Sequence, residues 1–270
     1  MTHPLHGKKL VIVGGASGIA RRLAADAIAA GATVVLAGRD HQKLTAAAAA
    51  TNATTTPALG AVAASVATTT DAATIVGRTG DAATIGIARV DLGAEDSIRE
   101  LAEQVGEFDY LVSLAANHAN GPVAELERAA ITRAFDAKVV GPILLAKHLA
   151  PNLREGGAIL LFSGFAAWRP APGRTVMATT NGAVSFLAQA LAVELAPIRV
   201  NALSPGIVDS GVWDGMGDNK SRFFADIAAA NPARRVGTAA DIAGAALLAL
   251  TNPFLTGTTL HVDGGGRLAS

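Results

Sequence analysis

The sequence predicts an α/β fold: a doubly wound parallel sheet with helices on both faces. Three observations support this fold class. Apolar runs of strand length alternate with helical patterns along the chain. The first run, residues 10–13, leads through a glycine turn directly into a helical pattern. Hydrophobic residues make up 50% of the 270 residues, which is enough to bury a sheet on both faces.

The first strand, turn and helix are the unit around which the remaining elements are expected to arrange. Gly14 lets the chain reverse after the strand, and Gly18 leaves room for a phosphate to approach the backbone. Ile19 and Leu23 lie on one face of the helix that follows. Its free N–H groups favour an anion. Taken alone, the pattern fits either a dinucleotide site or a structural turn.

A second buried strand is expected at residues 32–37, followed by Gly38, Arg39 and Asp40. In a doubly wound fold this strand end lies beside the adenosine ribose of a bound dinucleotide. Arg39 suits the 2′-phosphate of NADP, whereas an acidic residue would bind the 2′-hydroxyl of NAD. A solvated arginine in a turn is the alternative. Asp40 is expected to cap a helix that runs through Lys43 to residue 50.

Residues 51–85 differ in composition from the rest of the chain. They are rich in Ala and Thr, and Asp-Ala-Ala-Thr-Ile occurs twice, at 71–75 and 81–85. We interpret them as a surface insertion into a single domain that spans residues 1–270. A hairpin built from residues 72–78 and 82–89 is a possible structure. A subunit clasp or a substrate flap is the alternative role.

Strands and helices alternate over the remainder of the chain. Strands are expected at residues 85–90, 108–115, 158–162, 198–203 and 258–262. Helices are expected at 94–105, 125–149, 175–195 and 239–250. Gly156 and Gly157 are interpreted as a turn before a strand, and residues 209–235 as a mobile polar segment. The expected order of the seven parallel strands is 3-2-1-4-5-6-7.

Charge and composition exclude several classes of function. The 22 basic residues balance 22 acidic ones, so we expect no nucleic-acid partner. The absence of cysteine excludes disulfides and thiolate metal sites, and the six histidines are scattered, so no catalytic metal is expected. The start of the chain does not resemble a signal peptide, and the apolar runs are shorter than the roughly 18 residues of a membrane span. These features predict a cytoplasmic protein with no membrane partner.

Several motifs occur in an order that resembles the short-chain dehydrogenase/reductase family. Residues 13–20 are similar to its Thr-Gly-x-x-x-Gly-x-Gly turn, with Val13 and Ala20 as departures. Residues 90–92, 198–206 and 256–265 resemble three further motifs, and the likeness covers the chain outside residues 51–85. The resemblance implies a Rossmann fold, oxidoreductase activity and an NADP site formed by Gly14, Ala16, Ser17, Gly18, Ile19, Arg39, Asp91, Leu92, Ala115, Ala116, Asn181, Pro205, Gly206 and Val208.

The same resemblance indicates an altered catalytic set. In the family, a Tyr exchanges a proton with the substrate and a Lys lowers the pKa of that Tyr and orients the ribose. A Ser binds the substrate oxygen, and an Asn holds a water molecule. These four positions fall in turn on Met177, Asn181, Gly164 and Lys138. Methionine can neither donate nor accept the proton, and asparagine carries no charge that could shift a neighbouring pKa.

Three residues are candidates to replace the missing groups: Lys138, Asn181 and His118. Lys138 could supply a proton or a positive charge, and His118 lies on the loop after the fourth strand. A surface lysine and an exposed loop histidine are the alternatives. Arg174 occupies the Tyr position of the enoyl-reductase branch of the family, where it could bind a carboxylate or polarise an oxygen.

Two functions remain open from the sequence. The first is an NADP-dependent oxidoreductase that acts on a small molecule, either with a different proton donor or on an acceptor such as an iminium. The second is a non-redox or inactive relative that binds nucleotide or a small ligand. The family commonly forms homodimers or homotetramers through two long helices and the last strand. Aromatic residues indicate either an apolar ligand or interface packing: Trp168, Trp213, Phe223 and Phe224.

Overall fold

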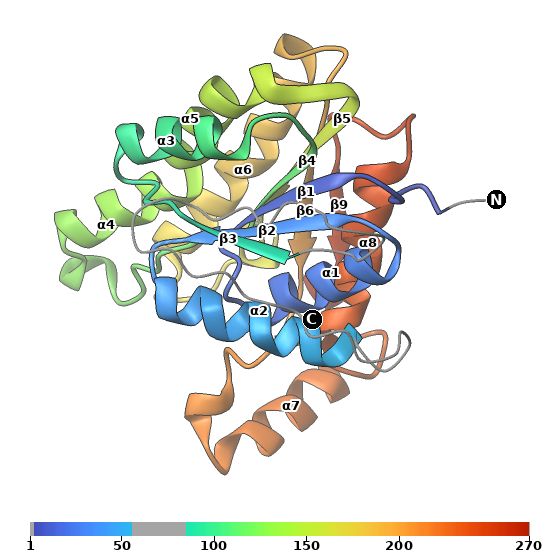
Figure 1. Ribbon diagram of the computed structural model, residues 1–270. Helices are drawn as coiled ribbons and strands as arrows, with labels where there is room; N and C mark the ends of the chain where they lie inside the picture. The colour runs from blue at the N-terminus through green and yellow to red at the C-terminus, as the bar shows by residue number, and fades with distance from the viewer. Residues whose placement is uncertain (1–2, 56–84, 270) are drawn as a thin grey trace.

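A parallel sheet of seven strands, in the order β3-β2-β1-β4-β5-β6-β9, forms the centre of the structure. The structure, a computed structural model, describes residues 3–55 and 85–269. The observed order confirms the predicted one, with β9 as the seventh strand of the main sheet. Figure 1 shows helices on both faces of this sheet.

The strands of the main sheet are β1 Lys9–Val13, β2 Thr33–Gly38, β3 Ile85–Arg89, β4 Phe108–Ser113, β5 Leu153–Phe162, β6 Arg199–Pro205 and β9 Thr259–Val262. A separate short pair consists of β7 Val208–Asp209 and β8 Gly237–Thr238. The helices are α1 Gly18–Ala29, α2 His41–Thr55, α3 Glu95–Val105, α4 Arg128–Phe135, α5 Gly141–Leu149, α6 Thr175–Glu194, α7 Asn219–Ala230 and α8 Ala239–Thr251.

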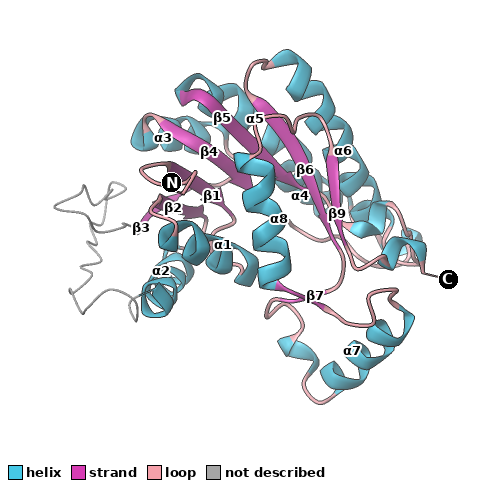
Figure 2. Cartoon of the chain, turned by 90° about the vertical axis from the view of Figure 1, so that its right-hand side faces the viewer, coloured by secondary structure: helices cyan, strands magenta, loops and turns pink. Residues whose placement is uncertain are grey.

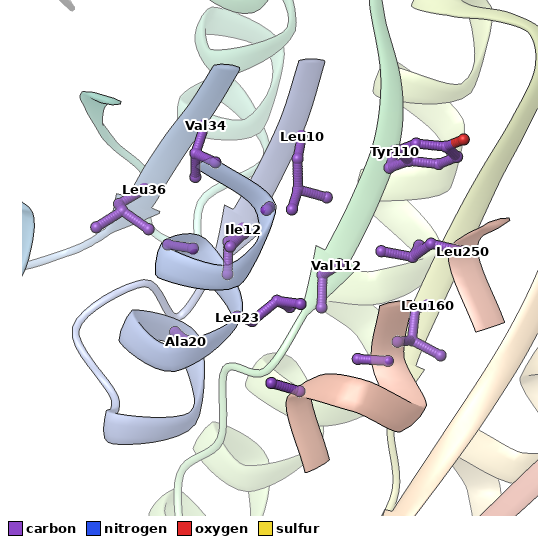
Figure 3. Close-up of a cluster of buried hydrophobic side chains, with 14 of the residues drawn as sticks. Leu10, Ile12, Ala20, Leu23, Val34, Leu36, Tyr110, Val112, Leu160 and Leu250 are labelled. Carbon is purple, nitrogen blue, oxygen red and sulfur yellow. The ribbon is translucent and has the colours of Figure 1, made fainter. Parts of the chain in front are cut away.

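Two hydrophobic cores lie on opposite faces of the sheet, because successive side chains of a strand point in opposite directions. Leu10 and Ile12 of β1 belong to the core formed with α1, α2 and α8 (Figure 3). Val11 and Val13 belong to the core formed with α3, α5 and α6. The sheet is therefore buried on both faces, as its continuous apolar strands require.

Helix α6 is the one helix among the described residues that is long and apolar enough to cross a membrane. Val184, Ala188 and Leu191 on its buried face pack in the core with strands β5 and β6. An apolar helix at this position is what a layer that covers a parallel sheet requires.

Two segments differ from the sequence prediction. Strand β5 begins at Leu153, so Gly156 and Gly157 lie within the strand instead of forming a turn before it. A Cβ at Gly157 would lie 2.9 Å from the carbonyl oxygen of Asp109, which explains why glycine is needed where β5 meets β4. The segment at 209–235 contains helix α7, which lies apart from the main helical layers in Figure 2. No residue of α7 is fully buried, and its apolar Phe223, Phe224 and Ile227 are only half-buried.

The boundaries of other elements also differ from those predicted from the sequence. Helix α2 continues to Thr55, so the first five residues of the predicted insertion, 51–55, are helical. The predicted hairpin lies almost entirely outside the described residues. Strand β4 ends at Ser113, although the N–H of Leu114 still donates to Val13 O at 2.8 Å. The long helical stretch begins at Arg128 and includes a π-helical turn, Asp136–Val140, just before Gly141.

Candidate functional site

The glycine turn after β1 is fixed by contacts to both neighbouring strands. The N–H groups of Gly14 and Gly15 donate to Ala37 O at 2.8 and 3.1 Å. Gly14 has a φ of +88°, and a Cβ there would lie 2.8 Å from the backbone nitrogen of Ala115. Ser17 caps helix α1, since its Oγ accepts a hydrogen bond from the Ala20 N–H at 3.1 Å. The turn therefore holds the N-terminus of α1 at the carboxyl edge of the sheet.

Gly18 has a different neighbour from the one that the sequence predicted. A Cβ at this position would lie 2.1 Å from the carbonyl oxygen of Ser210, in the segment that follows β7. In this structure the protein backbone itself approaches Gly18, where we expected space for a phosphate. The absence of a side chain at Gly18 is thus explained by contact with this segment.

A cleft of about 530 Å³ opens at the carboxyl ends of β1, β2, β3 and β4. This volume is within the usual range for a small-molecule site. The predicted site residues that line it are Gly14, Ala16, Ser17, Arg39, Asp91, Leu92, Ala115, Ala116 and His118. Predicted residues that do not line it are Gly18, Ile19, Lys138, Asn181, Pro205, Gly206 and Val208. The cleft thus brings together the residues that the sequence predicted for the adenosine half of the cofactor.

One end of the cleft is rich in basic side chains. The exposed Arg39 donates from its guanidinium to Asn117 Oδ1 at 3.2 Å, and Asn117 Nδ2 donates to Arg133 O at 3.3 Å. Lys43 and Arg133 line the cleft together with Arg39. Sequence analysis missed Asn117, Lys43 and Arg133 as site residues. Only Lys43 had a local signal, because it lies one turn into the helix that Asp40 caps, where Lys43 N–H donates to Asp40 Oδ1 at 3.0 Å.

Asp91 lies in a turn whose geometry is set by its own hydrogen bonds. Its Oδ1 accepts from the Gly93 N–H at 3.0 Å, and its backbone N–H donates to Ser97 Oγ at 3.0 Å. These bonds fix the loop after β3 at the cleft wall, where Leu92 also lies.

Lys138 lies in the π-helical turn, a type of irregularity that occurs frequently at functional sites. Its partly buried Nζ donates to the carbonyl oxygen of Ser163 at 3.3 Å. Withdrawal from water disfavours the charged form and lowers the pKa of Lys138 to about 8. An ammonium with such a pKa can exchange a proton near neutral pH.

Gly164 has no side chain, and this leaves the space that the side chain of Asn181 occupies. A Cβ at Gly164 would lie 2.7 Å from the Nδ2 of the buried Asn181. The main chain of Asn181 is held by Ser163, whose Oγ donates to Asn181 O at 2.8 Å. The amide of Asn181 thus lies against Gly164, onto which the resemblance places the Ser of the family.

His118 lies at the rim of the cleft, on the loop after β4. Partial desolvation, then the positive charges of Lys138 and Arg174, lower the pKa of His118. The same loop is tied to the start of α6, because the Gly121 N–H donates to Gly173 O at 3.0 Å. His118 therefore stays mostly neutral at pH 7 while no anion is bound.

The aromatic side chains pack mainly on other parts of the protein. Trp168 meets His261 edge-on, with ring centroids 4.8 Å apart. Trp213 packs on Phe223 at 4.9 Å and donates from Nε1 to Val208 O at 3.0 Å. Phe223 in turn packs on Phe224. These contacts stabilise the segment around α7, so the aromatic cluster has a structural role there.

Comparisons with known proteins agree with this architecture. The family model described as enoyl-(acyl carrier protein) reductase matches residues 87–266. A short-chain dehydrogenase/reductase from Acremonium sp, ucsE, is 30% identical over 98% of this chain and 97% of its own length. The solved MalC reductase/Diels–Alderase from Malbranchea aurantiaca has a TM-score of 0.84 at 27% identity, with 99% of both chains covered. A small-chain dehydrogenase solved with NADPH has a TM-score of 0.72 at 30% identity, covering 97% of this chain and 100% of its own.

Proposed function

The chain belongs to the short-chain dehydrogenase/reductase family, and on that basis we propose that it is an NADP(H)-dependent oxidoreductase with an atypical active site that acts on a small molecule. The observation that carries the proposal is the cleft in which the glycine turn, Arg39 and Asp91 meet. A solved relative with the same fold holds NADPH, which supports the choice of cofactor.

The residues of the cleft fit the adenosine half of NADP(H). Arg39 and Lys43 provide charge for a 2′-phosphate, and Asp91 and Leu92 flank the position of an adenine. Ala115 and Ala116 have small side chains that leave room beside the glycine turn. When bound, the cofactor supplies or accepts the hydride. We assign its nicotinamide half to the residues beyond the cleft, Ile19, Asn181, Pro205, Gly206 and Val208.

Replacing Arg39 with alanine is expected to weaken NADPH binding by about 10–100-fold, because a charge-assisted contact to the 2′-phosphate is lost. NADH lacks this phosphate, so its affinity is expected to stay within about twofold. Quenching of protein fluorescence, or energy transfer to the reduced nicotinamide, measures both affinities. Arg21, an exposed arginine on α1, gives a matched control in Arg21→Ala. Equal losses for NADPH and NADH would contradict the assignment of Arg39.

For the catalytic half we propose that Lys138 takes over proton transfer. Its ammonium donates a hydrogen bond to Ser163 O, which follows β5 and precedes Gly164. Met177 has a thioether side chain, which cannot exchange a proton with a substrate. The amide of Asn181 is free to hydrogen-bond ribose or substrate, since it makes no side-chain hydrogen bond within residues 3–55 and 85–269.

The experiment that tests the function begins with titrations of NADPH and NADH, followed by a screen for NADPH oxidation with ketones, aldehydes, imines and enones. The proposal expects NADPH to bind more tightly than NADH and to be oxidised by at least one class of acceptor. Absence of NADPH binding would contradict it. Tight binding without turnover by any acceptor would favour the non-redox alternative.

The outer faces of α5 and α6 suggest how the protein assembles, and we propose a homodimer or homotetramer. Exposed apolar side chains on this side include Ile143, Phe186 and Val193. A second exposed set near the last strand includes Leu248 and Phe254, the latter 98% exposed. Clusters of exposed apolar side chains are typical of interfaces between protein chains.

Replacing Phe186 with glutamate is expected to shift the protein to smaller assemblies, because it places a charge in an apolar interface. Light scattering after size-exclusion chromatography measures the mass. Ala50→Glu, at an exposed position on α2, is the matched control and is expected to leave the mass unchanged. An unchanged mass for Phe186→Glu would contradict an interface on α6.

A further inference from the structure

Three basic side chains from separate elements gather beyond the carboxyl ends of β4 and β5. Lys138 comes from the π-helical turn, His118 from the loop after β4, and Arg174 from the N-cap of α6. We call these three residues the basic cluster. None of the three takes part in binding the adenosine phosphates in the function proposed above.

The basic cluster is held together by packing of neighbouring residues. Ala119, Ala134 and Val176 form a small buried hydrophobic group. Ala119 follows His118, Ala134 lies one helical turn before Lys138, and Val176 lies two residues after Arg174. The Gly121–Gly173 hydrogen bond joins the same loop to the same helix start. The positive charges are therefore brought together by the fold and do not meet by chance rotation of long side chains.

The basic cluster has no acidic partner within the described residues. Lys138 contacts a neutral carbonyl oxygen, and none of the three side chains forms an ion pair in residues 3–55 and 85–269. Other basic side chains in those ranges do have partners, such as Lys220 with Asp209 and Asp214. Asp136, the acid nearest to Lys138 in sequence, lines the same cleft as His118 and forms no ion pair with the three side chains in residues 3–55 and 85–269. Lys138 and Arg174 are partly buried, and such cations without a counter-charge are costly unless a ligand supplies one.

We propose that the substrate of this site carries a carboxylate, which the guanidinium of Arg174 binds beside His118 and Lys138. The proposal rests on the function proposed above and names the substrate class. A guanidinium matches a carboxylate through two parallel hydrogen bonds, which makes Arg174 the group best suited to hold it. Desolvation lowers the pKa of His118 most, and the nearby positive charges of Lys138 and Arg174 lower it further. A carboxylate held there would leave the rest of the substrate beside Met177 and Gly164.

The test compares matched pairs of probes by calorimetry: benzoate against benzamide, and indole-3-acetate against indole-3-acetamide. The protein is first saturated with NADP⁺, so that the carboxylates do not bind at Arg39 and Lys43. We expect each carboxylate to bind at least about tenfold more tightly than its amide. Arg174→Gln should abolish this preference, Arg174→Lys should keep part of it, and Arg128→Gln, at an exposed position on α4, should keep all of it.

Equal affinity for carboxylate and amide, including failure of both to bind, would overturn the inference. A preference that survives in Arg174→Gln would do the same. Failure of the proposed function looks different, because it appears in the first step as an absence of NADP⁺ binding. In that event the same pairs are compared on the protein without nucleotide, and the preference and its loss in Arg174→Gln decide the substrate class independently.

Discussion

Replacing Lys138 with methionine is expected to lower kcat by about 10²–10⁴-fold, the usual contribution of a general acid or base. Methionine keeps a similar length but loses the proton and the charge. NADPH affinity should be unchanged, because Lys138 is not among the residues assigned to either half of the cofactor. Stopped-flow or steady-state NADPH oxidation, with an acceptor found by the screen, measures the effect. Lys147→Met, on the exposed side of α5, is the matched control.

The pH dependence provides a second measurement on Lys138. If Lys138 donates the proton during reduction, the protonated form is active. With a pKa of about 8, kcat/KM should be constant at lower pH and fall as pH rises through 8. Lys138→Arg separates the two roles, since arginine keeps the charge but does not release a proton at this pH. Full activity in Lys138→Met would show that the acceptor needs no protein acid, as with an iminium.

Replacing Gly14 with alanine is expected to lower the free energy of unfolding by about 2–5 kcal/mol. The φ of +88° costs an alanine roughly 1–2 kcal/mol, and the clash of its Cβ with the Ala115 nitrogen at 2.8 Å adds about 1–3 kcal/mol. For a chain of this size, the melting temperature should fall by roughly 5–15 °C. Thermal unfolding followed by circular dichroism measures the change, and NADPH affinity should fall with it.

Gly244 provides the control for this substitution. It lies within α8, and a Cβ there would meet no atom within 4 Å. Gly244→Ala should therefore raise the free energy of unfolding by up to about 1 kcal/mol, because alanine favours the helix. A melting temperature for Gly14→Ala equal to that of the unchanged protein would refute the account of the turn given above.

The sequence predicted most of the fold because its signals are local. Apolar runs identified the strands, and the alternation of strands with helices gave the order that the structure confirms. Helix α7 was missed because it lies apart from the main layers, and its few apolar residues, such as Phe223 and Ile227, are only half-buried. The strand start at Leu153 was missed because two glycines resemble a turn unless the partner strand is known.

The residues of the candidate site likewise fall into those that the sequence predicted and those that it did not. The glycine turn, Arg39 and Asp91 were found from sequence, because each lies at the end of a strand with a recognisable pattern. Arg133 could not be found, because its place beside the cleft depends on how α4 crosses the end of the sheet. The positions onto which the resemblance places the catalytic residues of the family could be named from the sequence, but their chemistry could not be interpreted from it.

By itself, then, the sequence determined the layered α/β architecture and the turn at Gly14, since these depend on periodicity and backbone conformation. Only the tertiary structure decided that Asn181 lies against Gly164 and that the backbone at Ser210 covers Gly18. It also decided that the elements carrying the basic cluster pack together, with no ion pair to its three side chains in residues 3–55 and 85–269. The physical reason is that these contacts join residues far apart in the chain, and their geometry is set by packing between elements.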